Sequence, residues 1–334
     1  MMNNNVPIDV VITWVDGSDP MWIKQRNNVC KELGLPLLDV NNVRYRDWDN
    51  LQYIFRGIDQ YMPWIRKVHF VTWGHIPKWL NVEDPRINIV KHDEFIPDKY
   101  LPTYNSSTIE LNLFRIKGLS EQFINFNDDM FVINKTNPEE FFKNGMPCDM
   151  ACISPQPIKS GEIFNTEFNN LQIINKYFTT DDVKRNIKKW NKPLLYGQYA
   201  IRTLIFMHFK TIIGLFEQHI PFSYKKSTIQ KVWTLEEDAL DRSCMHKFRS
   251  CEDHNEWLFR AWQLLSGDFI PRSKDFGILV PASDTNQIEN VLRSKKYKFI
   301  CINDDENIKN FVETKQHINN MLKSKFPNKS SFER

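Results

Sequence analysis

Three apolar runs in this chain each end in a cluster of acidic residues, and the first of them is rich in β-branched residues. The first run, residues 8–14, reads Ile-Asp-Val-Val-Ile-Thr-Trp and leads into the turn-forming segment 15–20. Residues 123–126 and 298–302 are similar runs that also precede paired aspartates. β-branched residues favour strands, whereas Asp, Gly and Pro end them. We therefore expect short buried strands whose ends carry carboxylates.

Helical patterns alternate with these strands. Apolar residues recur at three- and four-residue spacing in segments 21–33 and 49–61, and strand-like segments 67–73 and 87–90 follow. This rhythm predicts an α/β fold with a mostly parallel, Rossmann-like sheet. Further helices are expected over residues 108–123, 170–178, 199–217 and 252–265.

The chain of 334 residues has room for about two domains. The pattern weakens after residue 133, which indicates an insertion. We expect an α/β part over 1–133, a helical insertion and acceptor part over 134–300, a final strand and helix over 301–323, and a flexible basic tail over 324–334.

Composition excludes several classes of protein. There are 44 Lys and Arg against 41 Asp and Glu, a net charge of +3, and the charges are interleaved, so a nucleic-acid binder is not expected. The most apolar window, 194–222, contains too many charges for a membrane-spanning helix. Residues 1–10 lack the features of a secretory signal, which predicts a cytoplasmic protein. Six cysteines are too sparse for a disulfide scaffold, so reduced thiols are expected.

The acidic clusters are candidates for a metal site. Ligands bind beyond the carboxyl ends of strands in open α/β sheets, and Mg²⁺ in proteins is held by one or two carboxylates together with substrate phosphates. The alternative is turn chemistry, because Asp also caps helices and forms Asx turns. The three clusters are Asp16 with Asp19, Asp128 with Asp129, and Asp304 with Asp305.

Two further segments carry polar residues that suit a phosphate-containing substrate. Segment 103–115 contains Glu110, which is either part of a capping box begun by Ser106 or Ser107, or a side chain that faces the strand-end carboxylates. Arginine matches phosphate oxygens, so residues 44–47 are either a phosphate clamp or a solvated edge. The residues in question are Asn105, Ser106 and Arg115 in the first segment and Arg44, Arg46 and Asp47 in the second.

In order along the chain, four blocks resemble the Stealth family, which is named for bacterial capsule synthesis and also contains the animal N-acetylglucosamine-1-phosphotransferase α/β subunits. The first block is residues 8–19. The second extends from Arg-Tyr-Arg-Asp at 44–47 to Asn-Asp-Asp at 127–129. The third contains His-Ile-Pro at 219–221 and Phe-Arg-Ser at 248–250, and the fourth is Cys-Ile-Asn-Asp-Asp at 301–305.

This resemblance implies a nucleotide-sugar transferase domain and an enzyme that moves a hexose-1-phosphate from a UDP-sugar to a glycan hydroxyl. It implies release of UMP and formation of a phosphodiester, with an N-acetylhexosamine such as that of UDP-N-acetylglucosamine as the sugar. The functional residues it carries over are Glu110, Asp129, His219 and Arg249, and it places the first block, with Trp14, Asp16, Gly17 and Asp19, near the nucleotide.

Phosphoryl transfer relies on positioning and charge neutralisation, and the residues supply both. Our hypothesis is that Asp129 holds Mg²⁺ or Mn²⁺, either with Asp128 or with Asp304 and Asp305. Arg249 would stabilise the phosphoryl oxygens. His219 would be the general base, with Glu110 as the rival base. Two alternatives remain: a metal-dependent glycosyltransferase that releases UDP, and a non-catalytic polysaccharide-assembly protein. The expected partners are a UDP-sugar and a glycan or lipid-linked acceptor, and the basic tail suggests peripheral contact with the inner face of the membrane.

Overall fold

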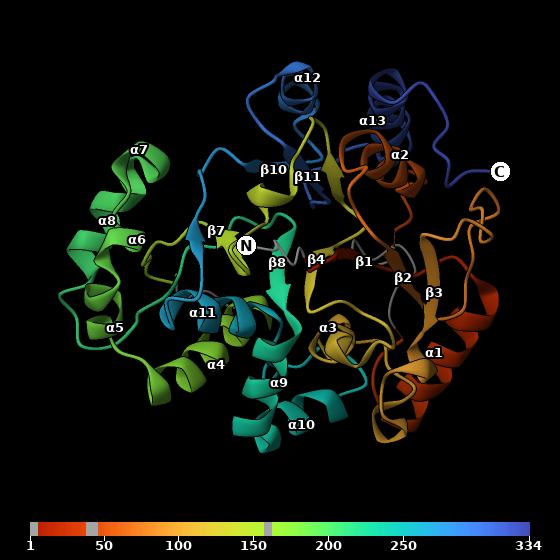
Figure 1. Cartoon of the computed structure of the whole chain (residues 1–334). Coiled ribbons are helices and arrows are strands. Elements are labelled where there is room, and N and C mark those ends of the chain that lie inside the picture. Colours follow the sequence, from red (N-terminus) through yellow and green to blue (C-terminus); the bar gives the residue numbers. More distant parts are fainter. Residues whose placement is uncertain (1–5, 38–45, 157–161) are drawn as a thin grey trace.

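The computed structural model describes residues 6–37, 46–156 and 162–334. Its centre is a five-stranded sheet in the order β3-β2-β1-β4-β8, in which the first four strands are parallel and β8 pairs antiparallel with β4 at one edge. This confirms the predicted mostly parallel α/β sheet (Figure 1). The strands are β3 (Ile87–Lys91), β2 (Val68–Thr72), β1 (Ile8–Trp14), β4 (Gln122–Phe126) and β8 (Phe222–Lys225).

A second sheet adjoins the first where the chain turns at Asn127, Asp128 and Asp129. This turn joins β4 to β5 (Met130–Val132), which pairs antiparallel with β11 (Phe299–Asn303), and β11 pairs parallel with β10 (Gly277–Pro281). The peptide N–H of Ile302 in β11 donates to the carbonyl oxygen of Asp129. The paired aspartates therefore lie where the two sheets meet. A small third sheet contains β6 (Phe142–Lys143), β7 (Met146–Asp149) and β9 (Ile270–Pro271).

Helices surround the sheets. In Figure 1, α4 to α8 lie on the left, α9 and α10 below the central sheet, and α2, α12 and α13 above it. The helices are α1 (Pro20–Glu32), α2 (Leu51–Tyr61), α3 (Ser106–Leu111), α4 (Glu162–Tyr177), α5 (Thr180–Arg185), α6 (Ile187–Trp190), α7 (Pro193–Tyr196), α8 (Gln198–Phe206), α9 (Lys226–Leu235), α10 (Glu237–Met245), α11 (Trp257–Leu265), α12 (Thr285–Arg293) and α13 (Phe311–Lys325).

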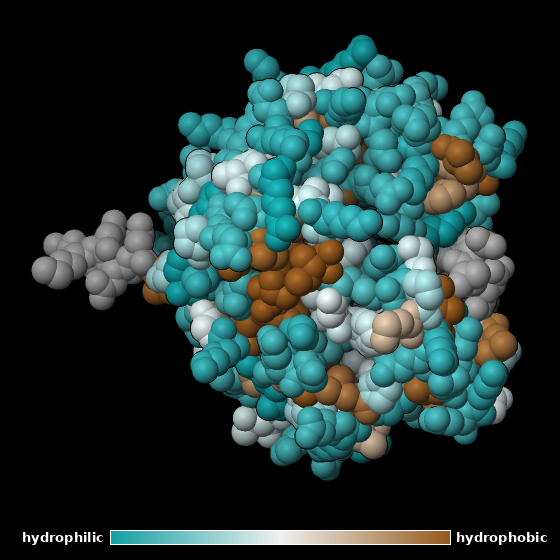
Figure 2. All heavy atoms as spheres, turned by 90° about the vertical axis from the view of Figure 1, so that its right-hand side faces the viewer, coloured by the Kyte–Doolittle hydropathy of each residue, from teal (hydrophilic) through white to brown (hydrophobic). Residues whose placement is uncertain are grey.

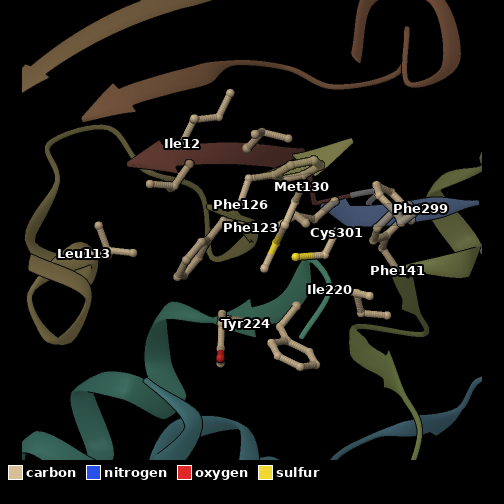
Figure 3. Close-up of a cluster of buried hydrophobic side chains, with 14 of the residues drawn as sticks. Ile12, Leu113, Phe123, Phe126, Met130, Phe141, Ile220, Tyr224, Phe299 and Cys301 are labelled. Carbon is tan, nitrogen blue, oxygen red and sulfur yellow. The ribbon is translucent and has the colours of Figure 1, made fainter. Parts of the chain in front are cut away.

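The hydrophobic core continues from the central sheet into the second one. Ile12 of β1, Phe123 and Phe126 of β4 and Phe299 of β11 are fully buried, and Figure 3 shows them in one cluster with Met130. Parallel strands covered on both faces read as continuous apolar runs, which is why residues 8–14 and 122–126 were recognisable in the sequence. This shared core fixes the two sheets relative to each other.

Three predicted helices are shorter than expected. The helix expected over 108–123 ends at Leu111, and Gly118, with φ of 79°, turns the chain into β4. The helix expected over 199–217 ends at Phe206, and residues 207–211 form turns and bends. The helix expected from residue 252 begins at Trp257, because Asp253 accepts from the N–H of Ser250 in a turn. In each case polar or glycine-containing turns override the apolar spacing.

The four parts into which the sequence analysis divides the chain do not correspond to separate units of the fold. Section 134–300 supplies β8 to the central sheet and β10 to the second sheet, so it shares both sheets with the rest of the chain.

The prediction of a flexible tail over 324–334 is wrong. Phe332 is buried against Phe55, and Arg56 binds Glu333 through two hydrogen bonds of 2.8 and 2.7 Å. An aromatic anchor and a paired carboxylate hold the tail on the protein.

The side of the molecule that carries α1, β3 and the C-terminus is mainly hydrophilic, with separate apolar patches (Figure 2). Within the described ranges, none of the helices has the length and apolar character needed to cross a bilayer.

Candidate active site

A cavity of about 830 Å³ opens at the carboxyl ends of β1, β4 and β11. Ligand sites of open α/β sheets lie at this edge, and the volume is in the range of pockets that hold small molecules. Segments far apart in the sequence contribute to its wall. The predicted site residues that line it are Trp14, Arg46, Asp47, Ser106, Glu110, Asp128, Asp129, His219, Arg249 and Asp304.

Asp128 and Asp129 project from the turn between β4 and β5. Solvent reaches Asp128 through the cavity, yet the enclosing protein and the neighbouring Asp129 carboxylate raise its pKa to about 7. Asp129 Oδ2 accepts from the Cys301 thiol at 3.2 Å, while the buried Oδ1 has no hydrogen-bond partner among the described residues. An unpartnered carboxylate oxygen next to a second carboxyl group is a donor set that favours a cation.

His219 faces Asp129 across the cavity wall. Its Nε2 lies 3.8 Å from Asp129 Oδ2, and Asp129, His219 and Cys301 together form a possible metal-binding group. Burial alone would lower the pKa of His219, but the Asp129 carboxylate, together with Glu256 and Glu217, raises it above its ordinary value. The imidazole is therefore tuned by an acidic environment, as expected of a group that transfers protons.

The backbone at His219 is held in an unusual conformation. Its φ is +47°, in the left-handed region that a non-glycine residue adopts only where neighbours enforce it. Gln218 Nε2 donates to the carbonyl oxygen of Lys274 at 2.6 Å, and Ile220 is fully buried. These contacts fix the segment on both sides of the histidine and thus aim its imidazole at Asp129.

Arg260 of α11 supports this segment from behind. It is completely buried and donates to the carbonyl oxygen of Phe216 at 3.1 Å and to Glu217, whose pKa burial raises to about 7 despite the arginine. Its Nε also donates to Asp149 Oδ2 at 2.7 Å. A buried arginine that joins two carboxylates in this way fixes the segment leading to His219.

Glu110 and Arg249 meet on the α3 side of the cavity. Burial, the nearby Glu256 and a hydrogen bond with it raise the pKa of Glu110 well above its ordinary value, and Arg249 opposes this. Arg249 Nη2 donates to Ser106 Oγ at 2.7 Å. Of the two readings of Glu110, the structure favours the one that faces the site, because it lines the cavity and lies five residues after the helix cap.

The expected cap at Ser106 or Ser107 is wrong, because Asn105 caps α3. Asn105 Oδ1 accepts from the N–H of Ser107 at 3.0 Å, and its Nδ2 donates to Asp253 Oδ2 at 2.7 Å. Asp253 also accepts from the N–H of Ser250, next to Arg249. Asn105 thus lies behind the cavity wall and joins α3 to the loop that carries Arg249.

Arg46 and Asp304 pair with each other in the cavity wall. Arg46 Nε and Nη2 donate to the two carboxylate oxygens of Asp304 at 2.9 and 2.5 Å, and Trp48 Nε1 donates to the same carboxylate at 3.2 Å. Because Arg46 binds both carboxylate oxygens of Asp304, the geometry does not favour Asp304 as a metal ligand. Asp47 also lines this wall, and burial raises its pKa, which favours the neutral form of its carboxyl group.

Several candidates lie outside the cavity lining and serve turns, as the alternative reading of the acidic clusters allowed. Asp16 accepts from the N–H of Ser18, Asp19 caps α1 by accepting from the N–H of Trp22, and Asp305 accepts from the N–H groups of Ser283 and Asn307. Gly17 is buried beside Asp16, and the exposed Arg115 stacks on Phe114 and Trp233. Arg44 lies outside the described residues.

Sequence reasoning missed Glu256, Asp253 and Arg260. Glu256 lines the cavity, and its Oε2 is buried with no hydrogen-bond partner in the described part of the chain. These residues come together only because α11 packs behind the 216–220 segment. In the sequence, the one feature that marked them was that each lies within or just before an apolar helix. Charged residues there normally indicate a solvated helix end.

Models of one protein family match the segments that carry Trp14, Glu110, Asp129 and Asp304. The chain matches Stealth protein conserved region 1 over residues 6–31, conserved region 2 over residues 44–149 and conserved region 4 over residues 290–334. It is 39% identical to a capsular polysaccharide phosphotransferase WcwK of Streptococcus pneumoniae, with all of both chains covered. The chain belongs to the Stealth family.

Other relatives carry similar names. The receptor polysaccharide phosphotransferase WefC of Streptococcus oralis is 32% identical, with 98% of this chain and 99% of the relative covered. The exopolysaccharide phosphotransferase cps2G of Lactiplantibacillus plantarum is 33% identical, with 98% of this chain and 96% of the relative covered.

Among solved structures, the chain is similar to the galactosyltransferase LgtC in complex with donor and acceptor sugar analogues. The identity is 9% over 95% of both chains, and the TM-score of 0.38 is too low to carry a conclusion. Within the matched Stealth regions lie Glu110, Asp128, Asp129 and Asp304, which line the cavity.

Proposed function

We propose that this Stealth protein transfers a hexose-1-phosphate, of the N-acetylhexosamine type, from a UDP-sugar to a glycan hydroxyl in the synthesis of a cell-surface polysaccharide. The names of its relatives, which are polysaccharide phosphotransferases, support the reaction class. The observation that carries the proposal is the meeting of His219, the Asp128 and Asp129 carboxylates and Arg249 in one cavity.

The reaction breaks one bond to phosphorus and forms another. The acceptor oxygen attacks the phosphorus that bears the sugar while its hydroxyl proton passes to His219. The bond from that phosphorus to the bridging oxygen breaks, and UMP leaves with this oxygen. The product is a phosphodiester that joins the sugar to the acceptor. Such transfers depend on positioning and on stabilising the charge of the phosphoryl oxygens.

His219 is the group best suited to accept the proton. Its imidazole lies in the cavity, and the contacts of Gln218 and Arg260 keep it oriented. Burial and the nearby Glu256 raise the pKa of Glu110, the rival base, which favours its protonated form over the carboxylate that a base requires. A protonated carboxyl group donates hydrogen bonds and cannot act as the base, so we assign Glu110 to binding the substrate.

Asp128 and Asp129 fit a divalent cation such as Mg²⁺ or Mn²⁺. Oδ1 of Asp129 has no hydrogen-bond partner among the described residues, and burial together with the Asp129 carboxylate raises the pKa of Asp128, so a cation at this point would relieve the repulsion between the two carboxyl groups. The Cys301 thiol has a pKa well above its ordinary value through burial, so it remains a hydrogen-bond donor to Asp129 rather than a thiolate ligand. A bound cation would supply positive charge for the diphosphate of the donor.

Arg249 and Arg46 supply the remaining positive charge at the cavity. Arg249 is exposed to the cavity and held by Ser106, so its guanidinium can turn toward phosphoryl oxygens at small cost. Arg46 is fixed by Asp304 and stacks on Phe311, which suits a rigid contact to the donor.

The test is an incubation with Mg²⁺, a panel of UDP-hexoses and short glycan acceptors, in which UMP and UDP are resolved and the product is examined by phosphorus NMR. We expect UMP and a phosphodiester for at least one UDP-N-acetylhexosamine, and about 10²- to 10⁴-fold slower formation of both with the His219→Ala variant. Release of UDP with a product free of phosphorus would instead identify a glycosyltransferase. No turnover, together with no stabilisation by UDP-sugar and Mg²⁺, would support an assembly role.

A further inference from the structure

The segment from Val183 to Phe216 differs in charge from the rest of the chain. It contains seven Lys and Arg residues and no Asp or Glu, although acidic and basic residues are almost balanced overall. It includes α6, α7 and α8, which lie at the outer left edge of the molecule in Figure 1. None of its basic residues lines the cavity.

The same segment exposes large apolar side chains. Leu194 is fully exposed, and Ile201, Ile205 and Phe209 have exposed fractions of 63%, 58% and 51%. Residues 201, 204 and 205 recur at helical spacing on one face of α8, while Ala200 and Thr203 on the other face are buried. We call Leu194, Ile201, Leu204, Ile205 and Phe209 the α8 patch. Apolar side chains gathered on one exposed helix face are typical of a surface that binds a protein or a membrane.

Unpaired lysines of the described ranges flank the residues of this patch in the sequence. Lys188, Lys192 and Lys210 are exposed and form no ion pair within the described part of the chain, whereas Lys184 and Arg185 pair with acidic residues of α5. Apolar side chains flanked by free lysines are the combination with which an interfacial helix binds the surface of an anionic bilayer.

We propose that the α8 patch binds the surface of an anionic lipid bilayer and holds the protein there without crossing it. A two-fold dimer through the same face would bring each set of lysines against its own copy, because such an interface pairs identical surfaces. The C-terminal tail, which the sequence suggested as the membrane contact, is packed against Arg56 and Phe55 instead.

The patch is linked to the active site. The N–H of Lys274 donates to the carbonyl oxygen of Leu195 in α7 at 3.0 Å, and the carbonyl oxygen of Lys274 accepts from Gln218, next to His219. A bilayer bound at α7 and α8 therefore lies against elements joined to the catalytic segment, an arrangement that suits an acceptor carried on lipid. The membrane proposal itself does not depend on the proposed reaction.

The experiment is vesicle flotation of the full chain without substrate. One set of vesicles is phosphatidylcholine, and the other contains about one third phosphatidylglycerol. We expect flotation with the anionic vesicles and about tenfold less with the neutral ones. The variant Ile201→Ser with Ile205→Ser should float about tenfold less than the parent, and Lys188→Glu with Lys192→Glu and Lys210→Glu should lose the preference for anionic lipid.

Matched controls are available because other exposed apolar side chains lie far away in the sequence. Met21→Ser with Val312→Ser, at 73% and 76% exposure, removes comparable surface and should float like the parent. Thermal melting checks that each variant is folded. We expect all of them to fold, because the changed side chains are exposed. The proposal is overturned if the parent fails to float with anionic vesicles, if the isoleucine variant floats as well as the parent, or if light scattering shows a dimer that this variant dissociates.

Discussion

The imidazole Nε2 of His219 lies 3.8 Å from Oδ2 of Asp129, although 90 positions separate the two residues in the sequence. Asp129 ends the turn between the two sheets, and His219 precedes the edge strand β8. The two groups meet because β8 pairs with β4, whose end carries Asp129. This pairing brings a candidate base beside a candidate metal ligand.

Replacing His219 by Ala should lower kcat about 10²- to 10⁴-fold, the range of a lost general base, and change the KM for the donor little. Steady-state assays of UMP release measure both constants. His208→Ala is the matched control, since His208 is exposed and absent from the cavity lining. An unchanged kcat in His219→Ala would exclude this residue as the base.

Replacing Asp128 by Asn should raise the Tm measured in EDTA by about 2–4 °C, because it removes repulsion between adjacent carboxylates in an enclosed cavity. The same variant should lose the rise in Tm that Mg²⁺ causes in the parent. Differential scanning calorimetry with and without Mg²⁺ measures both effects. Asp305→Asn, which changes a turn outside the cavity, should keep the response to Mg²⁺.

Replacing Asp304 by Asn separates a role in holding Arg46 from a role as metal ligand. Because Asp304 already binds Arg46 through both oxygens, we expect a higher KM for the donor, by about three- to tenfold, with unchanged dependence on Mg²⁺ concentration. Kinetics at varied donor and metal concentrations measure the two effects. A loss of apparent Mg²⁺ affinity would restore Asp304 to the metal site.

Replacing Arg260 by Met should lower the free energy of unfolding by about 3–5 kcal/mol, because it leaves Glu217 buried without its counter-charge and leaves Asp149 with only Arg272, whose Nη2 lies 4.0 Å from its Oδ1. Adding Glu217→Gln should recover part of this loss, since the unpaired Glu217 charge is then gone. Urea unfolding measures the stability of each variant. If the double variant is as unstable as the single one, the loss does not come from the Glu217 charge.

Replacing Glu333 by Gln should destabilise the protein at neutral pH by about 1–2 kcal/mol through loss of the pair with Arg56. Burial opposes ionisation of Glu333, but Arg56 and Ser330 hold its pKa below the ordinary value. The folded form thus binds the proton less readily than the unfolded chain, so this stabilisation is present above about pH 4 and is lost as the pH falls through the lowered pKa. Urea unfolding across pH, with the exposed Glu306→Gln as control, should show the difference from the parent disappear in acid.

Much of the fold was predictable because its signals are local. The strand at residues 8–14 and the turn at 127–129 were recognised correctly, since buried parallel strands are continuously apolar and Asp and Asn end them. The family resemblance followed from the same blocks and is confirmed. Helix ends were less predictable, because apolar spacing continues through Leu113 and Ile116 while the backbone turns at Gly118.

The neighbouring residues in the sequence also could not distinguish a carboxylate that accepts hydrogen bonds within a turn from one that faces a substrate. Asp19 and Asp129 both follow a buried strand, yet Asp19 caps a helix, whereas Asp129 has a buried oxygen without a hydrogen-bond partner in the described part of the chain. The difference depends on β11 and the segment before β8, which enclose Asp129 and reach it only after folding.

The sequence by itself determined the strands near residues 8–14, 67–73, 123–126 and 298–302 and the acidic residues that follow three of them, because each depends on residues close together in the chain. It also determined the membership of the Stealth family, because that depends on the order of the blocks along the chain and not on their contacts. The edge strand β8 was not predicted. Only the tertiary structure decided that Arg46 pairs with Asp304, that Glu256 lies beside Glu110 and that Phe332 anchors the tail. These contacts join residues far apart in the sequence, and their energy depends on burial and on the neighbouring charges, which no local pattern of residues records.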